Sequence, residues 1–419
     1  MVVWAENVAV GLDDSKIISS KEIMDRIERN QPLNYSNVVI LGDIDLKKIT
    51  ARNLTLITIP IKIQGATING NVDFDNVILG GTVDFKRTKF SGLASFNKTQ
   101  FLKGADFEEA KFDKSAFFLG SQFNDSASFM ATQFNRSVNF LEAKFRGEKA
   151  EFTRARFVGS ANFASARFYV ETEKFFESKF LGTAIFWDAE FNGPSDFWGA
   201  QFEDYVDFRF AKLAKSSDFT GAKFEGEVNL NGIEFESIII EWSSLKGRMI
   251  CNGPIYINLI KNFKELEQFD DADDCYYDYR DWKRTTRAWG WSKVFDYFAW
   301  LSCGYGIRWQ YPVLSGILIV VLFGIYYESH ALMMAMLAFP KAIRSVDLRT
   351  SELKQDLKRS ISFSAIILLS LSSEWSPFGK GEYEKFINRH LYCAIFERLI
   401  GWGLLLLLIG TLTRLMVRY

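Results

Sequence analysis

Residues 83–112 read VDFKRTKFSGLASFNKTQFLKGADFEEAKF, and phenylalanine recurs in this stretch at steps that alternate between five and six residues. The alternation runs from Phe85 to Phe235, with one extra residue before Phe152 and another slip near Phe175. Of the 28 positions in this register, 26 are Phe and two are Leu. A repeat of 11 residues predicts a fold built from stacked copies of one small unit.

A second signal lies two residues before each phenylalanine, where the side chain is almost always small, as in Ala94, Thr99 and Ala105. Residues i and i−2 of an extended chain point to the same side, so each large and small pair shares one face. Steps of five and six do not make a stripe on an α-helix. The pattern therefore predicts a β-solenoid with two repeats per coil of about 22 residues, and about nine coils between residues 38 and 240.

This repeat resembles the pentapeptide-repeat family, whose fold is a right-handed quadrilateral β-helix. The alternation of five and six departs from the family's plain step of five. The resemblance implies a β-helix over residues 38–245. Residues 15–31 have the pattern of a short amphipathic helix with Ser20 as the expected N-cap, which predicts a helical cap over residues 1–37. The solenoid core is expected to contain Phe96, Phe107, Phe118, Phe129 and Phe140.

Composition excludes several classes of function. The net charge is −1 and the polar positions mix Lys, Arg, Asp and Glu, so neither nucleic-acid binding nor DNA mimicry is expected. With two His, four Cys and no CxxC motif, we expect no catalytic residue, no metal site, no cofactor and no enzyme activity. The acidic run at residues 270–274 lacks the Gly and distal Glu of a calcium loop. Residues 1–5 contain no apolar h-region, so no signal peptide is expected there. The alternative is that residues 3–7 remain from a cleavage site after a signal peptide was removed.

The last third of the chain has the character of a membrane protein. Residues 246–308 predict a helical linker that ends in an aromatic, membrane-interface segment. Tyr311–Tyr327 and Leu399–Leu412 are apolar runs that predict two spanning helices. Residues 360–371 lie between them and are too short to span, which predicts a re-entrant helix. Residues 309–419 thus form the expected α-helical transmembrane pore-loop domain.

Helix, re-entrant helix, polar loop and helix, in this order, resemble the two-helix pore module of potassium-channel-like proteins. Residues 363–366 fall where the family's pore helix begins its approach to the filter, and Glu397–Trp402 resemble its pore-lining helix. The resemblance implies that Gly401, Leu405, Ile409 and Leu412 line the pore. It also implies that the pore is a homotetramer.

The expected filter departs from that family. It comprises Ser370, Leu371, Ser372, Ser373, Glu374 and Trp375. It contains no glycine that would expose carbonyl groups to potassium, whereas four copies of Glu374 around an axis would favour cations. The alternative is that Glu374 is only an exposed loop residue. The Gly-Tyr-Gly at residues 304–306 has no pore helix before it and is predicted to be an interfacial turn.

Two functions follow from these residues. The first is a multi-pass cell-membrane channel for a monovalent or divalent cation, whose partners are its own copies and the lipid bilayer. The second is a non-conducting, membrane-anchored scaffold whose solenoid binds another protein. By the positive-inside rule, the basic residues between the two spans favour a cytoplasmic loop and an extracellular solenoid. The alternative is the reverse arrangement, that of ordinary potassium channels, with the solenoid in the cytoplasm.

Overall fold

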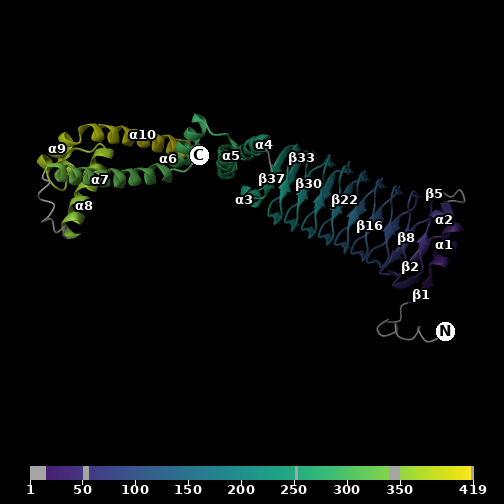
Figure 1. Ribbon diagram of the computed structural model, residues 1–419. Helices are drawn as coiled ribbons and strands as arrows, with labels where there is room; N and C mark the ends of the chain where they lie inside the picture. Colours follow the sequence, from purple (N-terminus) through teal and green to yellow (C-terminus); the bar gives the residue numbers. More distant parts are fainter. Residues whose placement is uncertain (1–15, 51–55, 251–252, 339–349, 417–419) are drawn as a thin grey trace. The chain divides into compact units, whose positions relative to one another are not determined.

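The computed structural model describes residues 16–50, 56–250, 253–338 and 350–416. The chain divides after Cys275 into two compact units, one of stacked strands and one of helices, which are described separately (Figure 1).

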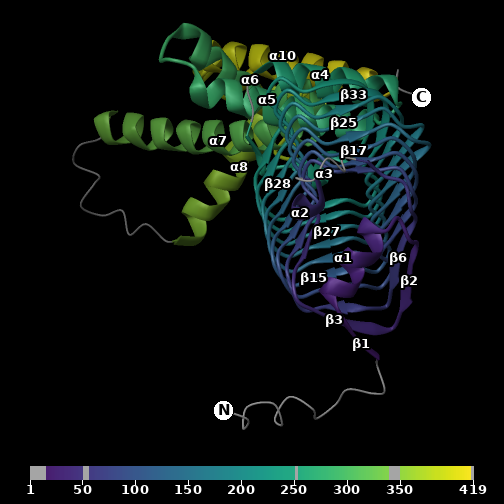
Figure 2. The same cartoon turned by 90° about the vertical axis from the view of Figure 1, so that its right-hand side faces the viewer.

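The first unit is a β-solenoid with four-sided coils. One coil consists of β10 (Val83–Asp84), β11 (Lys89–Phe90), β12 (Ala94–Ser95) and β13 (Gln100–Phe101). Each strand pairs in parallel with its counterpart in the next coil, as Val83 does with Ala105, which confirms the coil of 22 residues. Figure 2 looks along these stacked coils.

Hydrogen bonding joins the four columns of strands into three sheets. Two sheets have ten strands each, and the third has 17 because its two columns share the long strands β33 (Lys212–Asp218) and β36 (Glu234–Ile239). The stack has about ten turns rather than about nine, because strands before residue 38 join it and, in one sheet, a strand at residues 249–250 does so at the other end. The right-handed winding stays a prediction.

Inward phenylalanines stack face to face from coil to coil. The Phe107 and Phe129 ring centroids are 5.0 Å apart at an interplanar angle of 2°, and those of Phe118 and Phe140 are 4.7 Å apart at 8°. These four rings and Phe96 are 0% exposed. Such contacts contribute about 0.5–1.5 kcal/mol each beyond the burial of apolar area.

The alternation of five and six residues reflects two kinds of corner. After Phe85 the chain makes a tight turn in which the Thr88 N–H donates to the Phe85 carbonyl at 3.0 Å and Arg87 has a φ of 56°. Lys98 and Glu109 repeat this left-handed conformation at 11-residue intervals. The Arg87 N–H also donates to the Glu108 carbonyl of the next coil at 2.8 Å. Hydrogen bonds thus hold a backbone conformation that residues other than glycine seldom adopt.

The N-terminal end of the solenoid is covered by α1 (Ser20–Glu28), which buries Ile23 and Ile27. Its N-cap is Ser19, whose hydroxyl accepts from the Lys21 N–H at 3.2 Å, so the prediction of Ser20 was wrong by one residue. The expected helical cap is also only partly helical, because β1 (Lys16–Ser19) and β2 (Leu33–Ser36) pair within the sheets. Residues 1–15 of the cap lie outside the described residues. The short helix α2 (Lys47–Thr50) follows.

Side chains from helices close the C-terminal end. The last strand, β37 (Met249–Ile250), pairs with β35 (Val228–Asn229), so the solenoid extends five residues beyond the expected boundary at residue 245. In α4 (Gly253–Glu265), the Asn262 amide accepts from the Ile238 N–H at 2.9 Å and donates to its carbonyl at 2.8 Å. The amide thus takes the place of a further strand on an edge that would otherwise be unpaired.

The helical unit begins inside α5, and its elements differ in detail from expectation. They are α5 (Phe269–Thr286), α6 (Trp291–Ile307), α7 (Gln310–Ala338), α8 (Thr350–Leu368), the 3₁₀ turn η2 (Ser373–Trp375), α9 (Lys380–Arg389) and α10 (Leu391–Met416). The expected re-entrant helix is the second half of α8, which starts ten residues earlier because its charged first turns also favour helix. By length and composition, Gln310–His330 and Leu391–Arg414 qualify as candidate membrane spans.

Glu173 is a carboxyl group inside the solenoid. It lies in β26 (Thr172–Lys174) at the slip near Phe175, in register between Ala150 and Ser195, where other coils place a small residue. The side chain is fully buried and accepts one hydrogen bond, from the Gly193 N–H at 3.1 Å. Burial outweighs that bond and raises the pKa of Glu173 to about 8.

We predict that replacing one ring of the phenylalanine stack strongly destabilises the solenoid. Phe129→Ala leaves a cavity between neighbouring coils and should lower the free energy of unfolding by about 3–5 kcal/mol. Phe210→Ala is the matched control, because this phenylalanine stands outside the stack and is 55% exposed; it should change stability by less than about 0.5 kcal/mol. Hydrogen exchange of solenoid peptides in the full chain measures the loss of stability in both variants. An equal loss in Phe129→Ala and Phe210→Ala would contradict the stacked core.

A second prediction concerns the pH dependence of solenoid stability. Between pH 4.5 and about 8 the folded chain keeps the Glu173 proton that the unfolded chain releases. Rising pH therefore disfavours folding, by up to ~1.4 kcal/mol per pH unit, and the loss levels off above the folded pKa. Glu173→Ala restores the small residue of the repeat and should remove this slope. Denaturant unfolding at pH 5, 7 and 9 measures how the free energy of unfolding changes with pH. The same pH dependence in the original chain and in Glu173→Ala would show that Glu173 does not cause it.

Candidate functional site

The candidate site is the three-helix arrangement of α7, α8 and α10. The α8 helix runs antiparallel to α7, because Ser360 donates to Glu328 at 3.2 Å while Leu368 lies against Gly316. Gly316 lies 14 residues before His330, the last residue of the candidate span, which is about 21 Å along the axis of α7. The C-terminal end of α8 thus reaches well into the segment that qualifies as a span.

Glycines allow α8 to lie this close to both neighbours. A Cβ on Gly401 of α10 would be 2.0 Å from the Leu368 carbonyl oxygen. A Cβ on Gly324 of α7 would be 3.0 Å from the Ile361 Cα and 2.6 Å from its Cγ1. Because the Leu368 carbonyl cannot move aside cheaply, this packing requires glycine at position 401. At position 324 a Cβ would be in tight contact with Ile361 and would displace its side chain.

The predicted filter residues form the polar loop after α8. Ser370 has a φ of 53°, and its hydroxyl accepts from the Trp402 indole N–H at 2.7 Å. Ser372 then caps the η2 turn, whose Glu374 and Trp375 are exposed. The start of the loop is therefore hydrogen-bonded to α10, and Glu374 is exposed. Exposure in a single chain is compatible with Glu374 as a filter carboxylate and with Glu374 as an ordinary loop residue.

The predicted pore-lining residues divide into two groups. Gly401 is buried under the end of α8, whereas Leu405, Ile409 and Leu412 lie further along α10 and are exposed. An apolar groove of about 450 Å³ is lined by side chains of α7, α8 and α10. Its lining includes Gly316, Ile317, Leu368, Leu404, Leu405 and Leu408.

A buried polar network links the three helices. Ser364 and Glu397 belong to the two expected pore helices, but the sequence did not predict that they are hydrogen-bonded. The fully buried Glu397 of α10 accepts hydrogen bonds from the Tyr327 hydroxyl of α7 at 2.7 Å and from the Ser364 hydroxyl of α8. The one signal in the sequence was an acidic residue within an apolar helix, which in a membrane marks a functional position by default.

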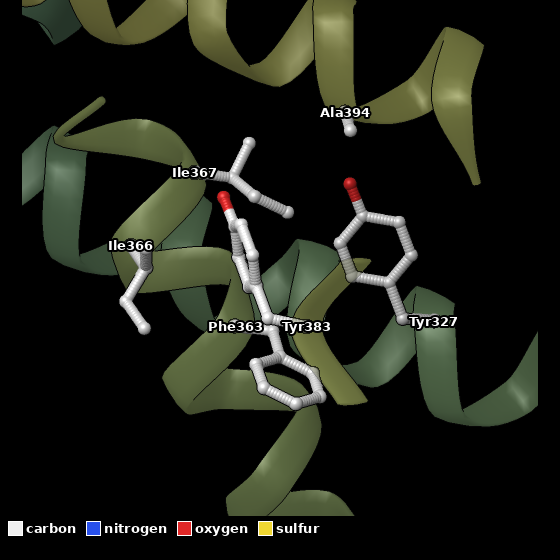
Figure 3. Packing of buried hydrophobic residues seen from close by; sticks show 6 residues of the cluster. All are labelled: Tyr327, Phe363, Ile366, Ile367, Tyr383 and Ala394. Atoms are coloured by element: carbon white, nitrogen blue, oxygen red, sulfur yellow. The ribbon is translucent and has the colours of Figure 1, made fainter. Parts of the chain in front are cut away.

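Apolar packing surrounds this network. Figure 3 shows Tyr327 of α7 beside Ala394 of α10, with Phe363 of α8 and Tyr383 of α9 next to each other. The Phe363 and Tyr383 ring centroids are 5.8 Å apart, so α9, which the sequence did not predict as a separate helix, packs on α8.

The chain's two histidines meet at the same end of the helices. The His330 and His390 ring centroids are 5.1 Å apart, and Tyr327 lies 5.0 Å from His390. Burial, with His330 and Arg389 nearby, lowers the pKa of His390. A polar cleft of about 370 Å³ opens beside them, lined by both acidic and basic side chains of α7, α8 and α9.

Two other motifs have structural roles. Asp271, in the acidic run at residues 270–274, accepts from the Trp242 N–H at 2.8 Å and so caps α3 (Trp242–Leu245) against the solenoid end. Within the described ranges, no three His, Cys, Asp or Glu side chains are grouped so as to hold a metal ion. Gly304, Tyr305 and Gly306 all have positive φ and form a left-handed turn before α7.

Comparison with known families agrees with the repeat. The family model described as pentapeptide repeats (9 copies) matches residues 63–111, 74–122 and 152–201. The first unit is a pentapeptide-repeat β-solenoid. These matches lie within the solenoid and leave the helical region with its two long apolar helices unassigned. No curated protein and no solved structure matches the chain.

We predict that α8 depends on the missing side chain at Gly401. Gly401→Ala forces a methyl group against the Leu368 carbonyl and should destabilise the helical unit by about 1–3 kcal/mol. Gly403→Ala is the matched control two residues away, since a Cβ there meets nothing within 4 Å. Thermal melting of the two variants in detergent, followed by tryptophan fluorescence, measures the difference. Identical melting curves would show that α8 does not pack on α10 as described.

Proposed function

We propose that the chain forms a cation channel in a cell membrane, with α7 and α10 as spanning helices and α8 as a re-entrant pore helix. The observation that supports this proposal most is how far along α10, counted from its first residue, the polar loop lies. Ser370 bonds to Trp402, which lies 11 residues after Leu391, or about 17 Å along α10. Irregular polar backbone at such a depth is tolerated in a bilayer only where it faces protein or water.

A homotetramer meets this requirement. Four copies of α8 and its loop around one axis would face a shared water-filled path, with α10 lining the path below them. The exposed Leu405, Ile409 and Leu412 would then face the cavity or a neighbouring subunit instead of lipid.

The loop chemistry supports a cation as the permeant species. Four Glu374 carboxylates at the axis would attract monovalent or divalent cations and repel anions. Residues 370–375 contain no glycine, which argues against the carbonyl filter of potassium channels.

The solenoid then serves as a sensor or assembly domain outside the membrane. The basic residues between the spans, among them Lys358, Arg359, Lys385 and Arg389, favour a cytoplasmic loop and therefore an extracellular solenoid. An exposed tryptophan on the surface of the solenoid supports the second candidate function, a membrane-anchored scaffold. Trp198 stacks on Phe176 at 4.9 Å and is 41% exposed, which offers an aromatic contact for a partner protein.

Reconstitution into planar bilayers tests the channel. The purified chain should carry cation current, and Glu374→Gln should lower the permeability of cations relative to anions several-fold. Glu384→Gln is the matched control, because this exposed carboxylate lies on α9 outside the loop; it should leave the permeability ratio unchanged. Silent bilayers over a range of voltage, pH and cation composition would refute conduction and favour the scaffold.

A further inference from the structure

The α6 helix carries an apolar face that nothing in the described structure covers. Trp291, Phe295 and Phe298 are 81%, 69% and 66% exposed, and Val294 and Leu301 are exposed beside them. These five positions follow the i, i+3, i+4, i+7 spacing, so they share one side of the helix.

The charged side chains of α6, with three arginines in or just after α5, lie between the two helices. Asp296 of α6 is buried and accepts from Arg280 at 2.7 Å and from Arg287 at 2.8 Å. The buried Arg284 guanidinium lies over the Trp300 ring at 4.3 Å and the Tyr297 ring at 4.9 Å.

This distribution is the inverse of a helix pair in water, which buries its apolar face and exposes its charges. Burying paired charges while leaving large aromatic side chains outside is favourable only where the surroundings are themselves apolar. Tryptophan and phenylalanine on one helix face are typical of helices that lie in the interface of a bilayer.

The position of α6 along the chain identifies the apolar surroundings. The left-handed turn at residues 304–306 connects it directly to α7, and the Ser315 hydroxyl of α7 donates to the Leu301 carbonyl at 3.0 Å. Ser315 is five residues into α7, or about 7.5 Å, which is within the depth at which interfacial helices bury their apolar face.

We propose that α6 lies in the phospholipid interface, with the face formed by Trp291, Val294, Phe295, Phe298 and Leu301 in the acyl boundary, and so holds the pore module at a fixed depth. The contact is apolar, so it requires no anionic lipid. The inference rests on the bilayer-spanning role proposed for α7 but not on conduction, so a chain that carries no current can still meet the test.

Nitroxide labels test this contact in the full chain, with its native cysteines replaced, in phosphatidylcholine nanodiscs. Phe295→Cys and Phe298→Cys carry the label at exposed positions, which leaves the packing of the hairpin unchanged. Lys103→Cys is the control, because this exposed residue lies on the solenoid. We expect labels on α6 to collide more with oxygen than with a water-soluble nickel chelate, and the label at residue 103 to show the reverse.

Two results would overturn the proposal. Access to the nickel chelate as high at residues 295 and 298 as at residue 103 would place the face in water. Spin–spin broadening that disappears when labelled chains are diluted with unlabelled ones, together with low access to both reagents, would show that a second copy of the chain covers it.

Discussion

Face-to-face stacking of phenylalanine rings from coil to coil is the interaction on which the solenoid depends. Strands of two residues are too short to be stable alone, so each is held by the coils above and below it. The rings stay in contact only if every coil returns to the same register, as Phe112 does over Phe134 at 5.0 Å. The extra residue before Phe152 leaves this register intact, since Phe129 and Phe152 remain 5.0 Å apart.

Backbone groups at the end of a sheet or of a helix also need hydrogen-bond partners. This requirement explains how both ends of the solenoid are covered and how α8 packs. Asn262 supplies the hydrogen bonds that a further coil would have made to Ile238. In the helical unit, Gly324 and Gly401 bring α8 into contact with two apolar helices, and the loop after it is tied to Trp402. A helix that ends at this level without a further spanning turn is compatible with a bilayer only if its end is covered by protein or reached by water.

The repeat was predictable from sequence because one residue type recurs at fixed steps over more than 150 residues. Its corners were not, since the positive φ of Arg87 or Glu109 depends on hydrogen bonds to a neighbouring coil. Likewise, Glu173 breaks the rule of small residues at a slip, and only the register shows that it points inward.

The helical unit was less predictable. Apolar runs revealed α7 and α10, because spanning length and composition are strong local signals. The start of α8 and the separate helix α9 depend on charged segments with weak periodicity. The bonds from Tyr327 and Ser364 to Glu397 join residues 70 and 33 positions apart, and no local pattern indicates such partners.

The symmetry of single particles in nanodiscs tests the channel most directly. A fourfold axis with the loop of residues 370–375 around it and α10 along it is the predicted result. Particles with a single copy of the chain, or an assembly whose axis is distant from that loop, would contradict a pore formed by α8 and α10.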